Sequence, residues 1–258
     1  MNNNRRAIEE VAHSLGLHRT VQKAFRRSIG RSGGLMSASL RRFFECLIRP
    51  GDLAFDVGAN TGKFSEALDS LGARVVAVEP NSGCARHIEL SYPRVRVIQA
   101  AVGSANEIVQ FFLSDSRSDL GSASKEWVDI LKSQHREYNG IWNRTAFVPC
   151  ITLDELIRHF GKPNYIKLDV EGLEEAALQG LSVQPPLLSF EFNTADLKAC
   201  FACLSRLRPE SQFNLIVDDT PKFACLNWMG KDQLKSFLNA MPPGEQHGDI
   251  FVSLSVRD

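Results

Sequence analysis

Residues 52–62 read Asp-Leu-Ala-Phe-Asp-Val-Gly-Ala-Asn-Thr-Gly. The first six residues form a short apolar run, and the glycines after it predict a tight turn. The next stretch, residues 61–71, carries apolar side chains at helical spacing at Phe64, Ala67, Leu68 and Leu71. The whole segment therefore predicts a strand, a glycine turn and a helix, which is the first unit of an open α/β sheet.

The same alternation continues along the chain. Strand-like runs occupy 74–78, 95–98, 164–168, 187–191, 213–218 and 250–256, and helical patterns occupy 82–91, 174–181, 195–207 and 231–240. Short loops between such elements predict a mostly parallel sheet with right-handed crossovers and helices on both faces. Residues 107–113 and 145–151 are expected to form two added strands that pair with each other. Thr152 and Glu155 predict a capping box at the start of a further helix.

Two regions differ from this pattern. Residues 1–49 hold ten basic side chains against three acidic ones, and we expect helices at 5–28 and 36–48 separated by a glycine-rich break. We interpret this part as a helical extension packed on the main domain of residues 50–258; a membrane-surface or anion-binding helix is the alternative. The polar stretch 114–143 is too long for a simple connection and predicts a lid, with Trp127 and Trp142 contacting the acceptor.

Composition sets the broad class. The 258 residues include 30 basic and 30 acidic side chains, so overall charge gives no reason to expect a nucleic-acid partner. Neither a membrane span nor a signal peptide is expected, because no apolar run is long enough. Scattered cysteines predict a reduced, cytoplasmic protein. Cys200 and Cys203 form a lone C-x-x-C, which we interpret as buried helix residues rather than as a zinc or redox site.

The turn after the first strand indicates an adenosine-type ligand. Gly58 would let the backbone approach a ligand, and Glu79 ends the next strand, where a carboxylate can accept both ribose hydroxyls. A dinucleotide motif would need glycines where Asn60 and Lys63 stand, and a P-loop would need a hydroxyl residue after Lys63. A ligand without phosphates fits better. S-adenosylmethionine is such a ligand, with an ammonium that Asp56 could hold.

A second motif, Ile166-Lys-Leu-Asp-Val-Glu-Gly172, follows a later strand. Asp169 should face the ligand crevice, and alternation puts Lys167 on the same side of the strand. Such a cluster costs desolvation free energy unless its charges are paired or used in chemistry. A structural ion pair of Lys167 with a carboxylate is the alternative interpretation. Glu191 ends the next strand at the same rim. It too could be a functional carboxylate at the ligand crevice or a partner in a structural ion pair.

Five segments together resemble the FkbM family of methyltransferases. They are residues 55–62, 78–81, 100–103, 152–155 and 166–172, which occur in the family's order. The resemblance implies a class I methyltransferase (Rossmann-like) fold, with seven strands of which the last is antiparallel. It also implies S-adenosylmethionine as donor and O-methylation of a small-molecule acceptor, such as a sugar or polyketide macrolide.

Carried over residue by residue, the resemblance gives a set of donor-binding candidates: Asp56, Gly58, Asn60, Thr61, Glu79, Pro80, Asp169, and Ala101 near the adenine. Asp169 and Glu171 match the family's second motif. We expect Asp169 to orient or deprotonate the acceptor hydroxyl, with help from Glu191 or from His135 in the polar insertion.

No metal site is predicted. Asp169, Glu171 and Asp196 offer oxygen ligands of the kind that magnesium prefers, but their spacing is not diagnostic. Two other functions remain open: an NAD-type oxidoreductase on a similar sheet, and a non-catalytic S-adenosylmethionine-binding protein.

Overall fold

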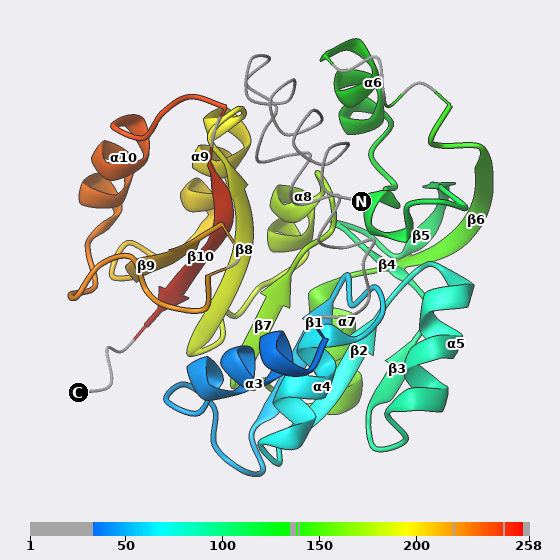
Figure 1. Cartoon of the computed structure of the whole chain (residues 1–258), viewed down its shortest axis with the longest axis horizontal. Coiled ribbons are helices and arrows are strands. Elements are labelled where there is room, and N and C mark those ends of the chain that lie inside the picture. Colours follow the sequence, from blue (N-terminus) through cyan, green and yellow to red (C-terminus); the bar gives the residue numbers. More distant parts are fainter. Residues whose placement is uncertain (1–32, 135–137, 139, 219, 245, 255–258) are drawn as a thin grey trace, which may run out of the picture.

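The computed structural model describes residues 33–134, 138, 140–218, 220–244 and 246–254 (Figure 1). These residues include a seven-stranded sheet of order β3-β2-β1-β7-β8-β10-β9. Its strands are β3 (Arg96–Ile98), β2 (Arg74–Val78), β1 (Leu53–Val57), β7 (Tyr165–Leu168), β8 (Leu187–Asn193), β10 (His247–Ser253) and β9 (Gln212–Val217). The pairs from β3 to β8 are parallel, whereas β10 is antiparallel to both β8 and β9. This order confirms the predicted class I methyltransferase fold.

Helices cover both faces of the sheet (Figure 1). One face packs against α3 (Gly33–Phe44), α4 (Lys63–Ser70) and α5 (Ser82–Ser91). The other packs against α7 (Leu153–Phe160), α8 (Glu174–Gln179), α9 (Leu197–Arg206) and α10 (Lys231–Asn239). The apolar runs of the central strands are therefore buried on both sides, as the sequence pattern predicts.

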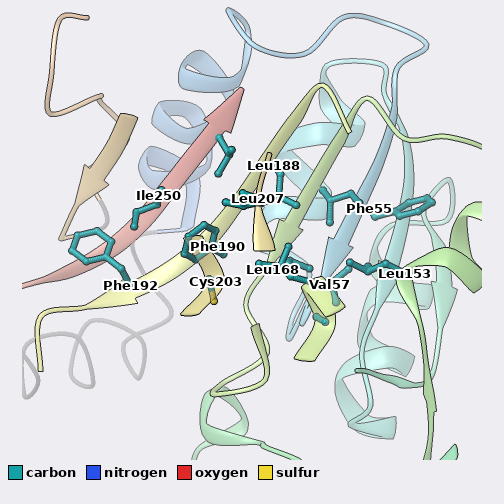
Figure 2. Close-up of a cluster of buried hydrophobic side chains, with 14 of the residues drawn as sticks. Phe55, Val57, Leu153, Leu168, Leu188, Phe190, Phe192, Cys203, Leu207 and Ile250 are labelled. Atoms are coloured by element: carbon teal, nitrogen blue, oxygen red, sulfur yellow. The ribbon is translucent and has the colours of Figure 1, made fainter. Parts of the chain in front are cut away.

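Alternation along β1 decides which side chains reach which layer. Phe55 and Val57 lie in the core beneath α7 and α8, together with Leu168 and Phe190 (Figure 2). Asp56 points to the opposite face, where α4 lies. Cys200 and Cys203 are buried residues of α9, which confirms their interpretation as core side chains.

A second sheet of order β4-β6-β5 lies beside the first. It consists of β4 (Ala101–Val102), β6 (Arg144–Ile151) and β5 (Glu107–Leu113). The predicted pairing of β5 with β6 is confirmed, and the structure shows that it is antiparallel.

The insertion between β5 and β6 has a helix that its polar sequence did not predict. It contains η1 (Ser118–Leu120) and α6 (Lys125–Gln134), and buries Leu120, Val128, Tyr138 and Trp142 in a small core of its own. The indole Nε1 of Trp142 donates a hydrogen bond to the Leu120 carbonyl at 2.6 Å. Trp142 thus packs within the insertion, which corrects the expectation that it contacts the acceptor.

Three further predictions concern the ends and positions of helices. Thr152 Oγ1 accepts the Glu155 N–H at 3.1 Å, but only this half of the capping box forms, because the Thr152 N–H donates to Asn106. Helix α3 begins at Gly33 and ends at Phe44, earlier than the predicted 36–48. The predicted helix at 5–28 lies outside the described residues.

None of the helices in the described part of the chain has the length and apolar character needed to cross a membrane.

Candidate functional site

A cavity opens at the carboxyl ends of β1, β2 and β7, with about 600 Å³ of space including its solvent-filled mouth. This is the edge of a parallel sheet where ligands bind. The walls come from four parts of the chain: the turn after β1, the end of β2, the β4–β5 region with the insertion, and the loop after β7. The polar side chains on its lining are Asn60, Glu79, Ser118, Asp119, Asp169 and Glu171.

Glu79 is the most enclosed of these carboxylates, with 6% of its surface exposed. Its Oε2 accepts the Asn60 N–H and its Oε1 accepts the Asn81 N–H, each at 2.7 Å. Burial raises the pKa of Glu79 to about 7, against the lowering effect of these two hydrogen bonds. Two backbone donors fix the plane of the carboxylate, and both oxygens retain acceptor positions that could meet a pair of vicinal hydroxyls.

Beneath the cavity lies a buried charge cluster. Lys167 is 1% exposed and donates from Nζ to Asp169 Oδ2 at 2.9 Å. Its Nζ also lies 4.3 Å from the centre of the Phe64 ring. Burial alone would lower the pKa of Lys167, but the charges of Asp169, Asp249 and Asp56 outweigh it and hold the pKa above its ordinary value. The ion pair of Lys167 with a carboxylate, which was the alternative interpretation of the sequence, is therefore present.

Asp56 belongs to this cluster and not to the cavity wall. Its side chain is completely buried, and its Oδ2 accepts a hydrogen bond from Ser65 Oγ of α4 at 2.7 Å. Burial raises its pKa, although Lys167 acts in the opposite direction. The expected contact of Asp56 with a ligand ammonium is therefore corrected, because strand alternation turns the side chain under α4.

The loop after β7 gathers further carboxylates. One carboxylate oxygen from each of Asp169, Glu171 and Glu191 lies within 4.8 Å of the other two. Asp196, expected near them, instead caps α9 by accepting the Ala199 N–H. Partly exposed acidic groups often cluster without an ion, so this arrangement alone does not predict a metal. Glu174 holds the loop, since its carboxylate accepts the backbone N–H groups of Val170 and Gly172.

A glycine is required at position 58 because of a neighbouring strand end, and not because of a ligand as the sequence suggested. Its φ is +78°, and a Cβ built on it would lie 1.8 Å from the Asp169 carbonyl oxygen. The missing side chain lets the turn after β1 pass the end of β7, which brings the two motifs together at the cavity.

A family model described as the methyltransferase FkbM domain matches residues 56–203, more than half of the chain. The chain belongs to the FkbM methyltransferase family. No curated protein sequence matches it.

Among solved structures, this FkbM-family chain is similar to a TehB-like SAM-dependent methyltransferase from Corynebacterium glutamicum, at 12% identity and a TM-score of 0.42 over 94% of this chain and 98% of that one. A SAM-dependent methyltransferase from Archaeoglobus fulgidus aligns at 13% identity and a TM-score of 0.42 over 90% of this chain and 99% of that one. A precorrin-6y C5,15-methyltransferase from Geobacter metallireducens aligns at 12% identity and a TM-score of 0.42 over 85% and 87%.

The structure of this FkbM-family member brings most of the predicted site residues together. Six of them line the cavity: Gly58, Asn60, Glu79, Pro80, Ala101 and Asp169. Glu191 lies beside Asp169, outside the cavity lining. Thr61 is exposed in the turn before α4 and does not line the cavity, so the expectation that it contacts the donor is not supported by its position. His135 lies outside the described residues.

Sequence reasoning missed several residues of the site. Phe111, Ser118 and Asp119 line the cavity from the second sheet and the insertion, and no spacing rule relates them to the motifs. Asp249 is 8% exposed, and its charge raises the pKa of Lys167. A lone acid in the apolar run of residues 248–252 was a signal that could have found it.

Proposed function

We propose that this protein is an S-adenosylmethionine-dependent O-methyltransferase whose acceptor is a hydroxyl of a sugar or another small molecule. The observation that carries the proposal is the joint presence of Glu79 and Asp169 on one cavity at the carboxyl edge of the sheet. Family membership supports methyl transfer. All six cysteines are free thiols, which supports the cytoplasmic location included in the proposal.

The residues present fit the donor. Glu79 presents a fixed, buried carboxylate suited to a ribose, and Ala100, Ala101, Val102 and Phe111 supply an apolar surface suited to a base. Bound there, S-adenosylmethionine supplies a methyl group made electrophilic by its sulfonium charge. The carboxylates around the cavity favour a cationic ligand over an anionic one.

In this mechanism Asp169 accepts the proton of the acceptor hydroxyl while the oxygen–methyl bond forms and the carbon–sulfur bond breaks. Lys167 holds Oδ2 of Asp169 from below, so the carboxylate is fixed in orientation. Glu191, beside Asp169, binds a neighbouring hydroxyl of the acceptor. Positioning of this kind supplies much of the rate enhancement in an in-line displacement.

Replacing Asp169 with Asn tests the assignment. Loss of a general base lowers kcat by roughly 10²–10⁴-fold, a larger effect than the weaker donor binding expected from the loss of one cavity carboxylate. The assay measures S-adenosylhomocysteine release with a panel of glycosides and macrolide alcohols. Asp196→Asn is the matched control, since Asp196 caps α9 away from the cavity. An unchanged kcat with only donor affinity altered would remove Asp169 from this role.

An NAD-type oxidoreductase is less well supported, because a carboxylate-lined cavity opposes the pyrophosphate of a dinucleotide. A non-catalytic binding protein would bind the donor but release no product in the same assay.

A further inference from the structure

A second cavity lies at the amino edge of the main sheet, at the opposite end of the strands from Glu79 and Asp169. The first residues of β1 and β2, the start of β3, the end of α4 with the turn after it, and the end of α7 form its lining. It has about 1010 Å³ of space, including its solvent-filled mouth. At roughly 3.3 Å per strand residue, the backbone of Arg74, which begins β2, lies ~16 Å from that of Glu79. A ligand in this amino-edge cavity is therefore distinct from the methyl donor.

Three arginines line the amino-edge cavity: Arg74, Arg94 and Arg96. Arg74 and Arg96 lie on the same face of the sheet, because Arg74 is two residues before Val76 and Val76 is the β2 partner of Arg96. Strand spacing puts diagonal neighbours of this kind within reach of long side chains. Two like charges so placed repel each other unless an anion lies between them.

The carboxylates of the described residues do not balance these charges. Arg94 donates from Nε and Nη2 to the two carboxylate oxygens of Asp69, at 3.0 and 2.8 Å. Arg74 and Arg96 form no ion pair within the part of the chain that the structure describes. Three arginines against the one carboxylate on the lining leave an excess of two positive charges.

Part of the lining is apolar. Leu53 and Val76 line the cavity from the buried strands, and Phe160 lines it from the end of α7. Phe160 is half-buried, so part of its ring is open to the cavity. A ligand that carries an apolar or aromatic group beside its negative charge can therefore contact both kinds of surface.

The end of α4 is the feature of this cavity that would oppose an anion. The last carbonyls of a helix carry partial negative charge. Here the Leu68 carbonyl accepts the Ala73 N–H, and the Asp69 carbonyl accepts the Gly72 N–H. These carbonyls are therefore capped by the turn after α4, and the arginines determine the sign of charge that the cavity favours.

We propose that the amino-edge cavity binds a phosphate monoester whose organic part is apolar or aromatic. Such a group carries about −1.5 to −2 charges near neutral pH, which matches the excess of positive charge. A phosphate diester carries less charge and leaves part of the excess unmatched. Guanidinium groups donate paired hydrogen bonds to phosphate oxygens, and the Phe160 ring contacts the organic part. The proposal is independent of methyl transfer, because it concerns the opposite edge of the sheet.

Phenyl phosphate, inorganic phosphate and phenol test the proposal by calorimetric titration of the full chain. Phenyl phosphate has both features of the proposed ligand, and each of the other two compounds has one. It should bind about tenfold more tightly than inorganic phosphate, the effect expected for burying an apolar group. No binding of phenyl phosphate would overturn the proposal. Equally tight binding of phenol or of inorganic phosphate would overturn it as well, since the cavity would then not recognise both features.

A double variant, Arg74→Gln with Arg96→Gln, assigns the binding to the amino-edge cavity. Both side chains are exposed, so the variant should fold, which circular dichroism checks. Its affinity for phenyl phosphate should fall about tenfold or more, because charged hydrogen bonds are lost. Arg86→Gln with Arg208→Gln is the matched control, since these exposed arginines pair with other acids and do not line the cavity. Equal weakening in the two double variants would overturn the proposal, because it would mark an effect of net charge alone.

Vesicles distinguish a lipid headgroup from a soluble ester as the source of the phosphate. Sedimentation with vesicles that contain phosphatidic acid, absent with pure phosphatidylcholine and lost in the double variant of Arg74 and Arg96, would assign the cavity to a lipid. Binding of phenyl phosphate without sedimentation would assign it to a soluble ester. Binding of neither probe by the folded protein would overturn the proposal.

Discussion

At the scale of single residues, the site contains more buried carboxylates than buried cations. Asp56, Asp169 and Asp249 surround Lys167, and Glu79 lies near two of these acids. One buried lysine cannot neutralise so many carboxylates, and the resulting field favours a ligand that carries positive charge. The same field and burial explain why Glu79 and Glu174 hold their protons more tightly than exposed acids, with a pKa of about 7 for each.

Donor affinity should therefore depend on pH near neutrality. Burial raises the pKa of Glu79 to about 7, so the carboxylate proposed to bind the ribose is present above this pH and is lost as the pH falls through it. Calorimetric titration should give a Kd about tenfold weaker at pH 6 than at pH 8, in proportion to the ionised fraction. Glu79→Gln should bind weakly with little pH dependence, and any residual slope is expected from Glu174. A variant with the wild-type pH profile would contradict this assignment.

At the scale of elements, the site depends on how closely two strand ends approach each other. The Asp169 N–H donates to the Val57 carbonyl, and the Gly58 N–H donates to the Val78 carbonyl, so ladder hydrogen bonds run into the loops. Gly58 and the Asp169 backbone then pass each other without room for a side chain. Both motifs are presented to the cavity by this single crossing of the turn after β1 and the end of β7.

Gly58→Ala measures the importance of that crossing. Gly51 offers a matched control, because it also has a positive φ (+86°) but no heavy atom lies within 4 Å of an added Cβ. Urea unfolding should show that Gly51→Ala costs about 1–2 kcal/mol, the strain of a left-handed backbone. Gly58→Ala should cost about 3–4 kcal/mol, within the range of severe single substitutions. Equal costs for the two variants would show that the close approach does not matter.

Much of the fold could be predicted because apolar periodicity reports directly on strands and helices. Helix α5 and strands β2 and β5 have the predicted ends, and the other elements predicted in the main domain differ from prediction by a few residues. The contents of the insertion could not be predicted, since α6 depends on a small core that forms only when Leu120, Val128 and Trp142 meet.

The candidate site was predictable only where it follows the motifs. The spacing placed Glu79 and Asp169 at one rim, but it could not show that Asp56 turns under α4, because that depends on which face α4 covers. Asp119 reaches the cavity through tertiary contacts of the insertion, for which the sequence has no pattern.

At the scale of the whole molecule, residues of three separate regions line one cavity: the first half of the main sheet, the loop after β7, and the second sheet with its insertion. The end of β2 in the main sheet supplies Glu79, the loop after β7 supplies Asp169, and the insertion supplies Asp119. A donor bound in this cavity would therefore be enclosed by parts of the chain that must all be in place together.

Calorimetric titration of the purified protein with S-adenosylmethionine, S-adenosylhomocysteine and NAD⁺ tests whether this cavity is a donor site. We expect both adenosyl compounds to bind with a micromolar Kd, on the order of −8 kcal/mol, and NAD⁺ not to bind measurably. The binding should be lost in Glu79→Ala, with circular dichroism confirming that the variant is folded. Binding of NAD⁺, or no binding of either adenosyl compound by the folded wild-type protein, would contradict the account.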